Sequence, residues 1–226
     1  MLRYWVAVLL VLTVSGGCRR SIKGGRTNVI LIMIDTLRAD HLGCYQYHVD
    51  VSPNIDKLCR EGVQFWNWHS TSSWTRPGMA TIVSGHYPGT VGVYEEKYDQ
   101  LPPDVVLLSE RLAEKGYLTL GVNANPNLNA VFGFSQGFEA YRDAGVVWGW
   151  MKSGGLPGEK VFASAKNNSD KATQITSRAL EAVDHFEDKT PFYLQLTYID
   201  PHWPYKPSPA NRETVEVGGS DHGGYD

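Results

Sequence analysis

Residues 28–35 have the sequence Asn-Val-Ile-Leu-Ile-Met-Ile-Asp, and this stretch decides the fold expected for the chain. A continuous apolar run from Val29 to Ile34 is typical of a strand covered on both faces in a parallel sheet. Parallel strands are joined by crossovers, usually helices, so the run predicts an α/β protein. It also places a carboxylate, Asp35, at the carboxyl end of a strand, where active sites of open α/β sheets lie.

Helix and strand patterns alternate along the rest of the chain. Residues 53–63, 77–83, 105–115 and 171–186 are predicted to be helices, and residues 117–122 and 191–199 strands. The first helix carries Ile55, Leu58, Cys59 and Val63 on one face, and Asp104 and Asp170 are the expected N-caps of the last two. Residues 123–169 are expected to form loops and short elements. These elements predict a mostly parallel sheet sandwiched by helices.

Residues 72–88 have the sequence Ser-Ser-Trp-Thr-Arg-Pro-Gly-Met-Ala-Thr-Ile-Val-Ser-Gly-His-Tyr-Pro. They put a hydroxyl, Thr75, two residues before Pro77, which can open a helix because proline lacks an N–H that would be unpaired there. The free N–H groups and the positive dipole end of a helix start favour an anionic ester beside Thr75. A strand-end carboxylate and a helix-start hydroxyl form the layout that a metal-assisted ester hydrolase needs.

The bulk composition is that of an ordinary globular protein. The chain has 226 residues, 42% of them hydrophobic, and a formal net charge of −3. This length is ample for one core, and a near-neutral charge argues against nucleic acid as a partner.

The first residues are typical of a secretory signal peptide. A basic start at Arg3, an apolar run over residues 4–14 and small residues before Cys18 make up the pattern, and the run is too short to span a membrane. The small-small-Cys ending resembles a bacterial lipobox, in which the cysteine becomes the lipidated first residue. We expect an exported periplasmic or cell-surface lipoprotein, anchored to the membrane through Cys18, with residues 19–27 as a tether. The alternative is a plain cleaved signal peptide.

Two further cysteines, Cys44 and Cys59, remain in the mature chain. An exported chain permits a disulfide, but the favoured interpretation is two small buried residues.

Six short segments occur in order between residues 28 and 205. They are Ile-Met-Ile-Asp35-Thr-Leu-Arg-Ala-Asp-His-Leu-Gly-Cys-Tyr, Ser52-Pro-Asn-Ile-Asp56, Ser73-Trp-Thr75-Arg-Pro-Gly-Met-Ala, Ser84-Gly-His-Tyr-Pro88, Gly116-Tyr-Leu-Thr119 and Asp200-Pro-His202-Trp-Pro-Tyr. In this order and spacing they resemble the sulfatase family of the alkaline phosphatase superfamily. The resemblance implies that superfamily's α/β fold and assigns residues 28–226 to the N-terminal part of a sulfatase-like catalytic domain.

The resemblance implies that Asp35 binds a divalent cation and that Thr75 holds the nucleophile position, in contact with the metal. In sulfatases that position is a cysteine or serine, oxidised to formylglycine within Cys/Ser-x-Pro-x-Arg. Threonine cannot give formylglycine, and Gly78 and Met79 replace the usual serine and arginine, so we expect no formylglycine. Threonine is the nucleophile in related phosphodiesterase-type members.

Three further positions bear on the metal and the substrate. Calcium-dependent sulfatases typically have two adjacent aspartates where this chain has Asp35 and Thr36, so a preference for calcium becomes doubtful, and zinc or manganese, as in the threonine-using relatives, becomes more credible. His202 matches the family histidine that contacts the anionic group or the leaving-group oxygen. Asn123 and Asn125 lie where sulfatases often carry a lysine and a histidine that hold the sulfate, and amides there could donate to it.

The last residues contain Asp221-His222-Gly223, which spells the Asp-His-Gly motif that supplies other metal ligands in the family. The motif comes too soon after His202, so a polar loop is the favoured interpretation, with Asp221 and His222 as the alternative metal ligands. We expect a truncated sequence that holds the nucleophile half of the site.

Three functions remain open from the sequence. The first is a metal-dependent hydrolase of sulfate esters, acting on a small-molecule, glycan or lipid ester. The second is a phosphodiesterase or phospho-group transferase of the same superfamily. The third is a non-catalytic lipoprotein that binds an anion or a glycan.

Overall fold

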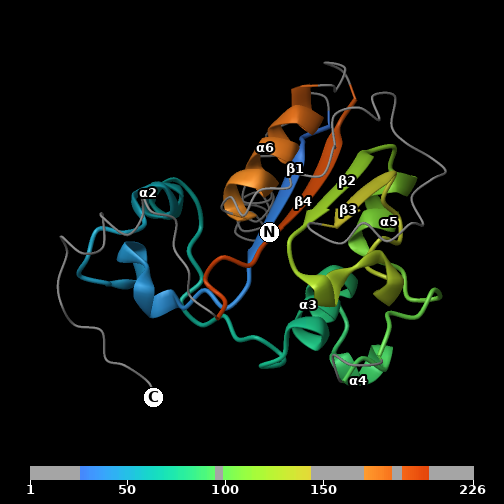
Figure 1. Cartoon of the computed structure of the whole chain (residues 1–226), viewed down its shortest axis with the longest axis horizontal. Helices are drawn as coiled ribbons and strands as arrows, with labels where there is room; N and C mark the ends of the chain where they lie inside the picture. The colour runs from blue at the N-terminus through green and yellow to red at the C-terminus, as the bar shows by residue number, and fades with distance from the viewer. Residues whose placement is uncertain (1–25, 95–98, 144–170, 185–189, 204–226) are drawn as a thin grey trace, which may run out of the picture.

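A parallel sheet forms the centre of the protein (Figure 1). The computed structural model describes residues 26–94, 99–143, 171–184 and 190–203. The strands are β1 (Val29–Ile34), β2 (Leu118–Asn123), β3 (Ala140–Asp143) and β4 (Phe192–Tyr198), arranged in the order β1-β4-β2-β3. Ile34 pairs with Tyr198, and Asn123 pairs with Thr197. The carboxyl ends of β1, β4 and β2 therefore meet at one edge.

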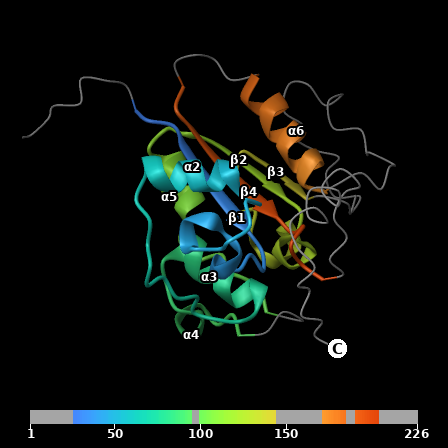
Figure 2. The ribbon, with the colours of Figure 1, turned by 90° about the vertical axis from the view of Figure 1, so that its left-hand side faces the viewer.

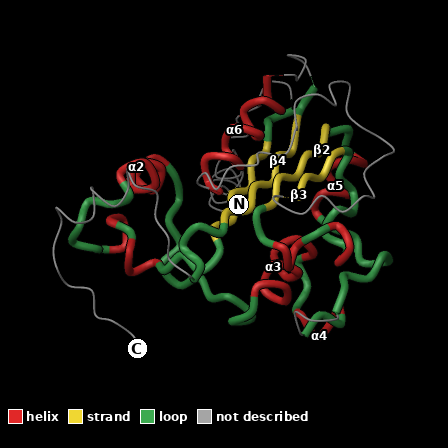
Figure 3. The backbone as a smooth tube through the Cα atoms, in the orientation of Figure 1, coloured by secondary structure: helices red, strands yellow, loops and turns green. Residues whose placement is uncertain are grey.

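Helices cover both faces of this sheet. They are α2 (Pro53–Glu61), α3 (Thr75–Ser84), α4 (Pro88–Val91), α5 (Leu108–Glu114) and α6 (Lys171–Asp184), with short 3-10 helices η1 (Ala39–His41), η2 (Gly43–Tyr45), η3 (Pro126–Leu128) and η4 (Ala130–Phe132). Figure 2 shows α6 on one side of the sheet and α5 on the other. Past the carboxyl end of β1, long loops carry α2 to the side of the sheet (Figure 3). This arrangement confirms the predicted fold class.

Two hydrophobic clusters lie on the two faces of the sheet. On the α6 face, Ile175 and Ala179 pack against apolar residues of β2 and β4. On the other face, Met33 of β1 packs with Met79 and Val83 of α3. The central strands β2 and β4 are buried along nearly their whole length, including polar residues such as Asn123 and Gln195.

The expected burial of β1 on both faces is wrong for the described residues. Ile30 and Ile32 are 54% and 53% exposed. β1 is an edge strand of the described sheet, and α6 packs against β4 and β2 instead. One face of β1 is therefore left partly open within the described chain.

The predicted face of the first helix is also wrong. Leu58 is 66% exposed and Val63 is exposed, whereas Asp56 is buried. The helix packs against the loop that carries η2 and not against the sheet, so its buried side is the one that carries the carboxylate.

Helix and strand boundaries differ from the predictions at a few positions. α3 begins at Thr75, with Trp74 as its N-cap, and Gly85 ends it in a left-handed conformation with φ 72°. α5 begins at Leu108, so Asp104 is not its cap; the Glu110 carboxylate accepts from the Leu107 N–H instead. The short strand β3 was not predicted. Asp170 and Phe186 lie outside the described residues.

Among the described residues, none of the helices has the length and apolar character needed to cross a membrane. The expected signal peptide and tether, with Cys18, lie outside the described residues.

Candidate active site

Asp35 lies directly after β1 at the carboxyl edge of the sheet. Its N–H donates to the Tyr198 carbonyl at 2.9 Å, which extends the pairing with β4 by one residue. The side chain is only 8% exposed. A buried carboxylate requires hydrogen-bond partners, and Asp35 has two from distant segments of the chain.

These two partners are the predicted nucleophile and a predicted substrate-binding amide. Thr75 Oγ1 donates to Asp35 Oδ2 at 3.1 Å. Asn125 Nδ2 donates to the same oxygen at 2.5 Å. The structure thus brings together three residues that the sequence singled out separately: one directly after β1, one at the start of α3 and one in the loop after β2.

Thr75 is the first residue of α3 and not its N-cap. Trp74 occupies the cap position and provides no side-chain hydrogen bond there. The Thr75 hydroxyl is directed to Asp35. It lies at the positive end of a ten-residue helix, where an anionic ester is favoured.

Asn123 and Asn125 are both 1% exposed but have different partners. Asn123 Nδ2 donates to the Asn125 carbonyl at 2.7 Å, and Asn123 Oδ1 accepts from the Asn125 N–H at 2.9 Å. Asn123 therefore holds the turn in shape, and Asn125 contacts Asp35.

Arg76 is a residue of the site that the sequence analysis missed. It is 1% exposed. Its Nε donates to the Asn127 carbonyl and its Nη1 to the Asp99 carbonyl, both at 3.0 Å. Its guanidinium carbon lies 3.5 Å from the centre of the Phe132 ring. The only sequence signal was a charged residue directly after the nucleophile candidate.

Hydrogen bonds close a ring around the Thr75 hydroxyl. Arg76 follows Thr75 in the chain and binds the Asn127 carbonyl. The Asn127 N–H donates to Asn125 Oδ1 at 2.9 Å. Asn125 in turn binds Asp35, which accepts from Thr75. The start of α3 is thereby fixed relative to the end of β1.

Thr36 has a strained backbone next to this ring. Its φ is 58°, a left-handed conformation that is unusual for a β-branched residue. Its hydroxyl donates to the Asp35 carbonyl at 2.7 Å. Such outliers cluster at functional sites, where the surroundings hold them in place.

His202 lies in the turn after β4, on the same edge of the sheet as Asp35. Its N–H donates to the Ile199 carbonyl at 2.9 Å, and its Nδ1 lies 2.8 Å from the Trp203 carbonyl. A carbonyl oxygen only accepts, so Nδ1 carries the proton in this contact and Nε2 is left for the substrate. The side chain is exposed, and no hydrogen bond among the described residues joins it to Asp35.

The remaining candidates lie elsewhere or outside the described residues. Asp200 follows β4, and its Oδ1 accepts from the Ala172 N–H at 3.1 Å at the start of α6. Asp40 is exposed, and its pairing with Arg38 lowers its pKa. Asp221 and His222 lie outside the described residues. Within the described part of the chain, no three His, Cys, Asp or Glu side chains are grouped closely enough to hold a metal.

A model of the sulfatase family matches residues 27–223. The chain belongs to the sulfatase family. Human arylsulfatase A is 33% identical over 97 residues, which are 41% of this chain and 19% of that enzyme. The multifunctional alkaline phosphatase superfamily protein PehA of Trinickia caryophylli is 28% identical over 227 aligned positions, covering 80% of this chain and 43% of PehA.

A solved structure shows the same fold. The phosphonate monoester hydrolase of Agrobacterium radiobacter superposes with a TM-score of 0.66 at 21% identity, over 86% of this chain and 45% of that enzyme. The resemblance to sulfatases and the alkaline phosphatase-like fold are confirmed. This sulfatase-family chain spans less than half the length of each of these three relatives.

Proposed function

We propose that this protein hydrolyses sulfate esters, with Thr75 as the nucleophile. The observation that carries the proposal is the 3.1 Å hydrogen bond from Thr75 Oγ1 to Asp35 Oδ2. It sets a hydroxyl beside a buried carboxylate at the strand edge where active sites of α/β sheets lie. Membership of the sulfatase family supports a sulfuric ester as the substrate.

Thr75, Asp35 and His202 each have a separate role in the proposed hydrolysis. Thr75 Oγ1 presents its proton to Asp35 Oδ2, so its lone pairs are left to form a bond with the sulfur of the ester. The bond from sulfur to the leaving-group oxygen breaks, and His202 gives that oxygen the proton on Nε2, a step that uses the imidazolium form because Nδ1 keeps its own proton on the Trp203 carbonyl. Water then attacks sulfur and gives a proton to Nε2 of His202, sulfate leaves, and the Thr75 oxygen takes back its proton from Asp35.

The site also has donor atoms for a divalent cation. Among the described residues, both side-chain hydrogen bonds to Asp35 fall on Oδ2, which leaves Oδ1 to bind an ion. Asp35 and Thr75 supply oxygen ligands of the kind that hard cations take. A bound cation would stabilise the negative charge that develops on the ester. Thr36 stands where calcium-dependent sulfatases have a second carboxylate, so the site carries less negative charge than theirs. This difference favours zinc or manganese over calcium. Asp221 and His222 remain candidates for further ligands.

A phosphoric ester is the second candidate substrate. Threonine favours attack on phosphorus in related phosphodiesterase-type enzymes, and the name of PehA places a 28% identical relative in the alkaline phosphatase superfamily. Small-molecule, glycan and lipid esters are all candidate substrates of this chemistry.

Paired ester assays test the proposal. We expect the protein encoded by the whole reading frame to release the aryl leaving group from a sulfate ester faster than from the matching phosphate mono- and diesters. Faster turnover of either phosphate ester would move the assignment to the second candidate. A folded protein that turns over none of the esters, and whose stability is unchanged by a chelator, would favour the non-catalytic anion-binding alternative.

We also propose that the protein is exported and anchored through a lipid on Cys18. Labelling of growing cells with a palmitate analogue should mark the wild-type protein and leave Cys18→Ser unlabelled. Absence of label on the mature wild-type protein would contradict the anchor.

A further inference from the structure

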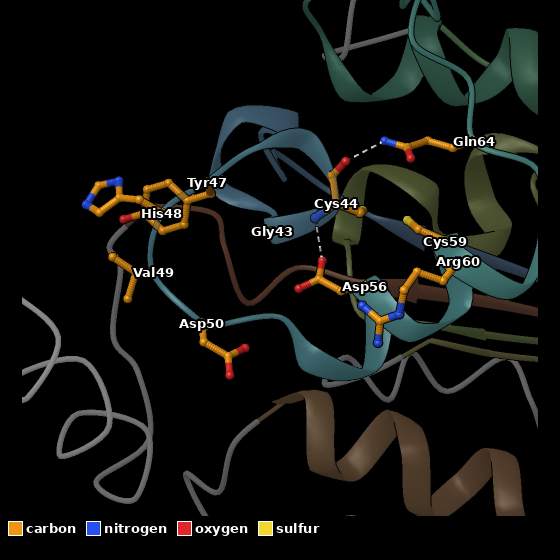
Figure 4. Close-up of a pocket in the computed structure, with 10 residues that line it drawn as sticks. All are labelled: Gly43, Cys44, Tyr47, His48, Val49, Asp50, Asp56, Cys59, Arg60 and Gln64. Carbon is orange, nitrogen blue, oxygen red and sulfur yellow. Dashed lines mark hydrogen bonds between the residues drawn. The ribbon is translucent and has the colours of Figure 1, made fainter.

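A pocket separate from the Asp35 edge opens between η2 and α2 (Figure 4). Its volume is about 460 Å³. Cys44 from η2 and Cys59 from α2 both line it, and Figure 4 shows their sulfur atoms pointing toward one another. The two elements pack against each other, so the cysteines meet although they are far apart along the chain.

The backbone around Cys44 is anchored on both sides. Its N–H donates to Asp56 Oδ1 at 2.8 Å, and its carbonyl accepts from Gln64 Nε2 at 2.8 Å. The neighbouring Gly43 N–H donates to Ser52 Oγ at 3.0 Å, and the Ser52 hydroxyl also contacts the Asp56 carboxylate. A Cβ on Gly43 would lie 2.4 Å from Asp56 Oδ2, so the loop approaches the helix more closely than a larger residue would permit.

Helix register brings Cys59 to the same place. Cys59 lies three residues after Asp56 in α2, and residues three apart share one face of a helix. The carboxylate that binds the Cys44 amide therefore belongs to the face that carries Cys59. A disulfide requires two Cα atoms within about 7 Å and Cβ atoms that face one another, and these contacts favour that geometry.

The raised pKa of Cys44 decides which of the two cysteines reacts first with an external disulfide. Burial, with contributions from Cys59 and Asp56, raises the pKa of Cys44 to about 12. Cys44 is therefore a thiol at neutral pH, and thiols attack disulfides poorly compared with thiolates. The first attack on an external disulfide falls to Cys59.

We propose that Cys44 and Cys59 are a modification site that forms an intramolecular disulfide under oxidising conditions. Both are free thiols in the structure. The oxidant is a low-molecular-weight disulfide such as glutathione disulfide. The Cys59 sulfur attacks it, forms a mixed disulfide and releases one glutathione thiol. Cys44 then loses its proton, attacks the Cys59 sulfur and releases the second glutathione thiol, which leaves the two thiol protons on the two released molecules.

Peptide mapping after oxidation tests the proposal. The purified protein is incubated with glutathione disulfide, quenched with acid, alkylated and digested without reduction. We expect one cross-linked peptide pair that joins Cys44 to Cys59, lighter than the two separate peptides by two hydrogen atoms and lost on treatment with dithiothreitol. Cys44→Ser is the matched control, and it should stop at the glutathione adduct of Cys59.

Three results would overturn the proposal. In the first, both cysteines remain open to alkylation. In the second, the wild type stops at glutathione adducts. In the third, the cross-link involves Cys18 instead. The thermal midpoint gives a second measurement, because oxidation should raise it in the wild type and not in Cys44→Ser or Cys59→Ser. No substrate enters either measurement, so the outcome is independent of the ester hydrolysis proposed above.

Discussion

Replacing Arg76 with methionine should destabilise the protein strongly, although Arg76 is a polar residue in a helix. The substitution keeps an unbranched stem and removes the guanidinium. Two partly buried carbonyls, of Asn127 and Asp99, then lose the donor that lies 3.0 Å away. The loss of a charged donor from a carbonyl that is largely shielded from water costs about 1–3 kcal/mol. The lost contact with the Phe132 ring adds about 1 kcal/mol.

Removing a buried charge recovers part of this loss, because the guanidinium no longer has to be desolvated. We therefore expect the free energy of unfolding of Arg76→Met to fall by about 3 kcal/mol. Urea denaturation followed by tryptophan fluorescence measures it, and Arg111→Met is the matched control. Arg111 is exposed on α5, so its substitution should change the free energy of unfolding by less than about 0.5 kcal/mol. If Arg76→Met were as stable as Arg111→Met, the reasoning about the hydrogen-bonded ring would be refuted.

Three further predictions concern the η2 loop and His202. Gly43→Ala should lower the free energy of unfolding by about 1–3 kcal/mol, because the new Cβ meets Asp56 Oδ2 at 2.4 Å, whereas Gly89→Ala, with a 3.6 Å contact, should be near neutral in the same urea titration. Burial opposes the ionisation of Asp56, but hydrogen bonds from the Cys44 amide and the Ser52 hydroxyl hold its pKa below the ordinary value. The ionised carboxylate therefore stabilises the fold above pH ~4, and this stabilisation is lost as the pH falls through the lowered pKa. Unfolding of the wild type and Asp56→Asn across acidic pH should show a difference that shrinks toward low pH; a constant difference would contradict the linkage. His202→Gln should slow hydrolysis of an alkyl sulfate more than that of a nitrophenyl sulfate, because a poor leaving group depends more on protonation; equal slowing of both esters would argue against the proton-donor role.

The fold was predictable where one physical cause dominated the sequence. The run that forms β1 is bounded by polar residues on both sides, and its predicted limits are those of the structure. The α2 face was mispredicted because periodicity shows which residues are apolar, but not that a loop held by Asp56 would cover the polar side. The strand β3 was missed because its four residues, Ala140–Asp143, alternate little and are too few to show a period.

The sequence predicted the side chains of the candidate site, but not the hydrogen bonds of Arg76 that hold them in place. Asp35 and Thr75 were candidates because they lie at a strand end and a helix start, and such positions converge at one edge of a parallel sheet. Asn125 was a candidate only through the resemblance to sulfatases. Arg76 was missed because its partners are backbone carbonyls far along the chain, and the sequence does not reveal which carbonyls a guanidinium will meet.

The central claim is that the Thr75 hydroxyl is the attacking group. The most direct measurement is the rate of aryl sulfate hydrolysis by the protein of the whole reading frame, compared between wild type, Thr75→Val and Thr90→Val. Valine keeps the shape of threonine and removes only the hydroxyl, and Thr90 is an exposed residue of α4 outside the site. We predict that Thr75→Val folds normally and loses at least about a thousandfold in kcat/KM, while Thr90→Val retains the wild-type value. Hydrolysis by Thr75→Val at the wild-type rate would contradict the account.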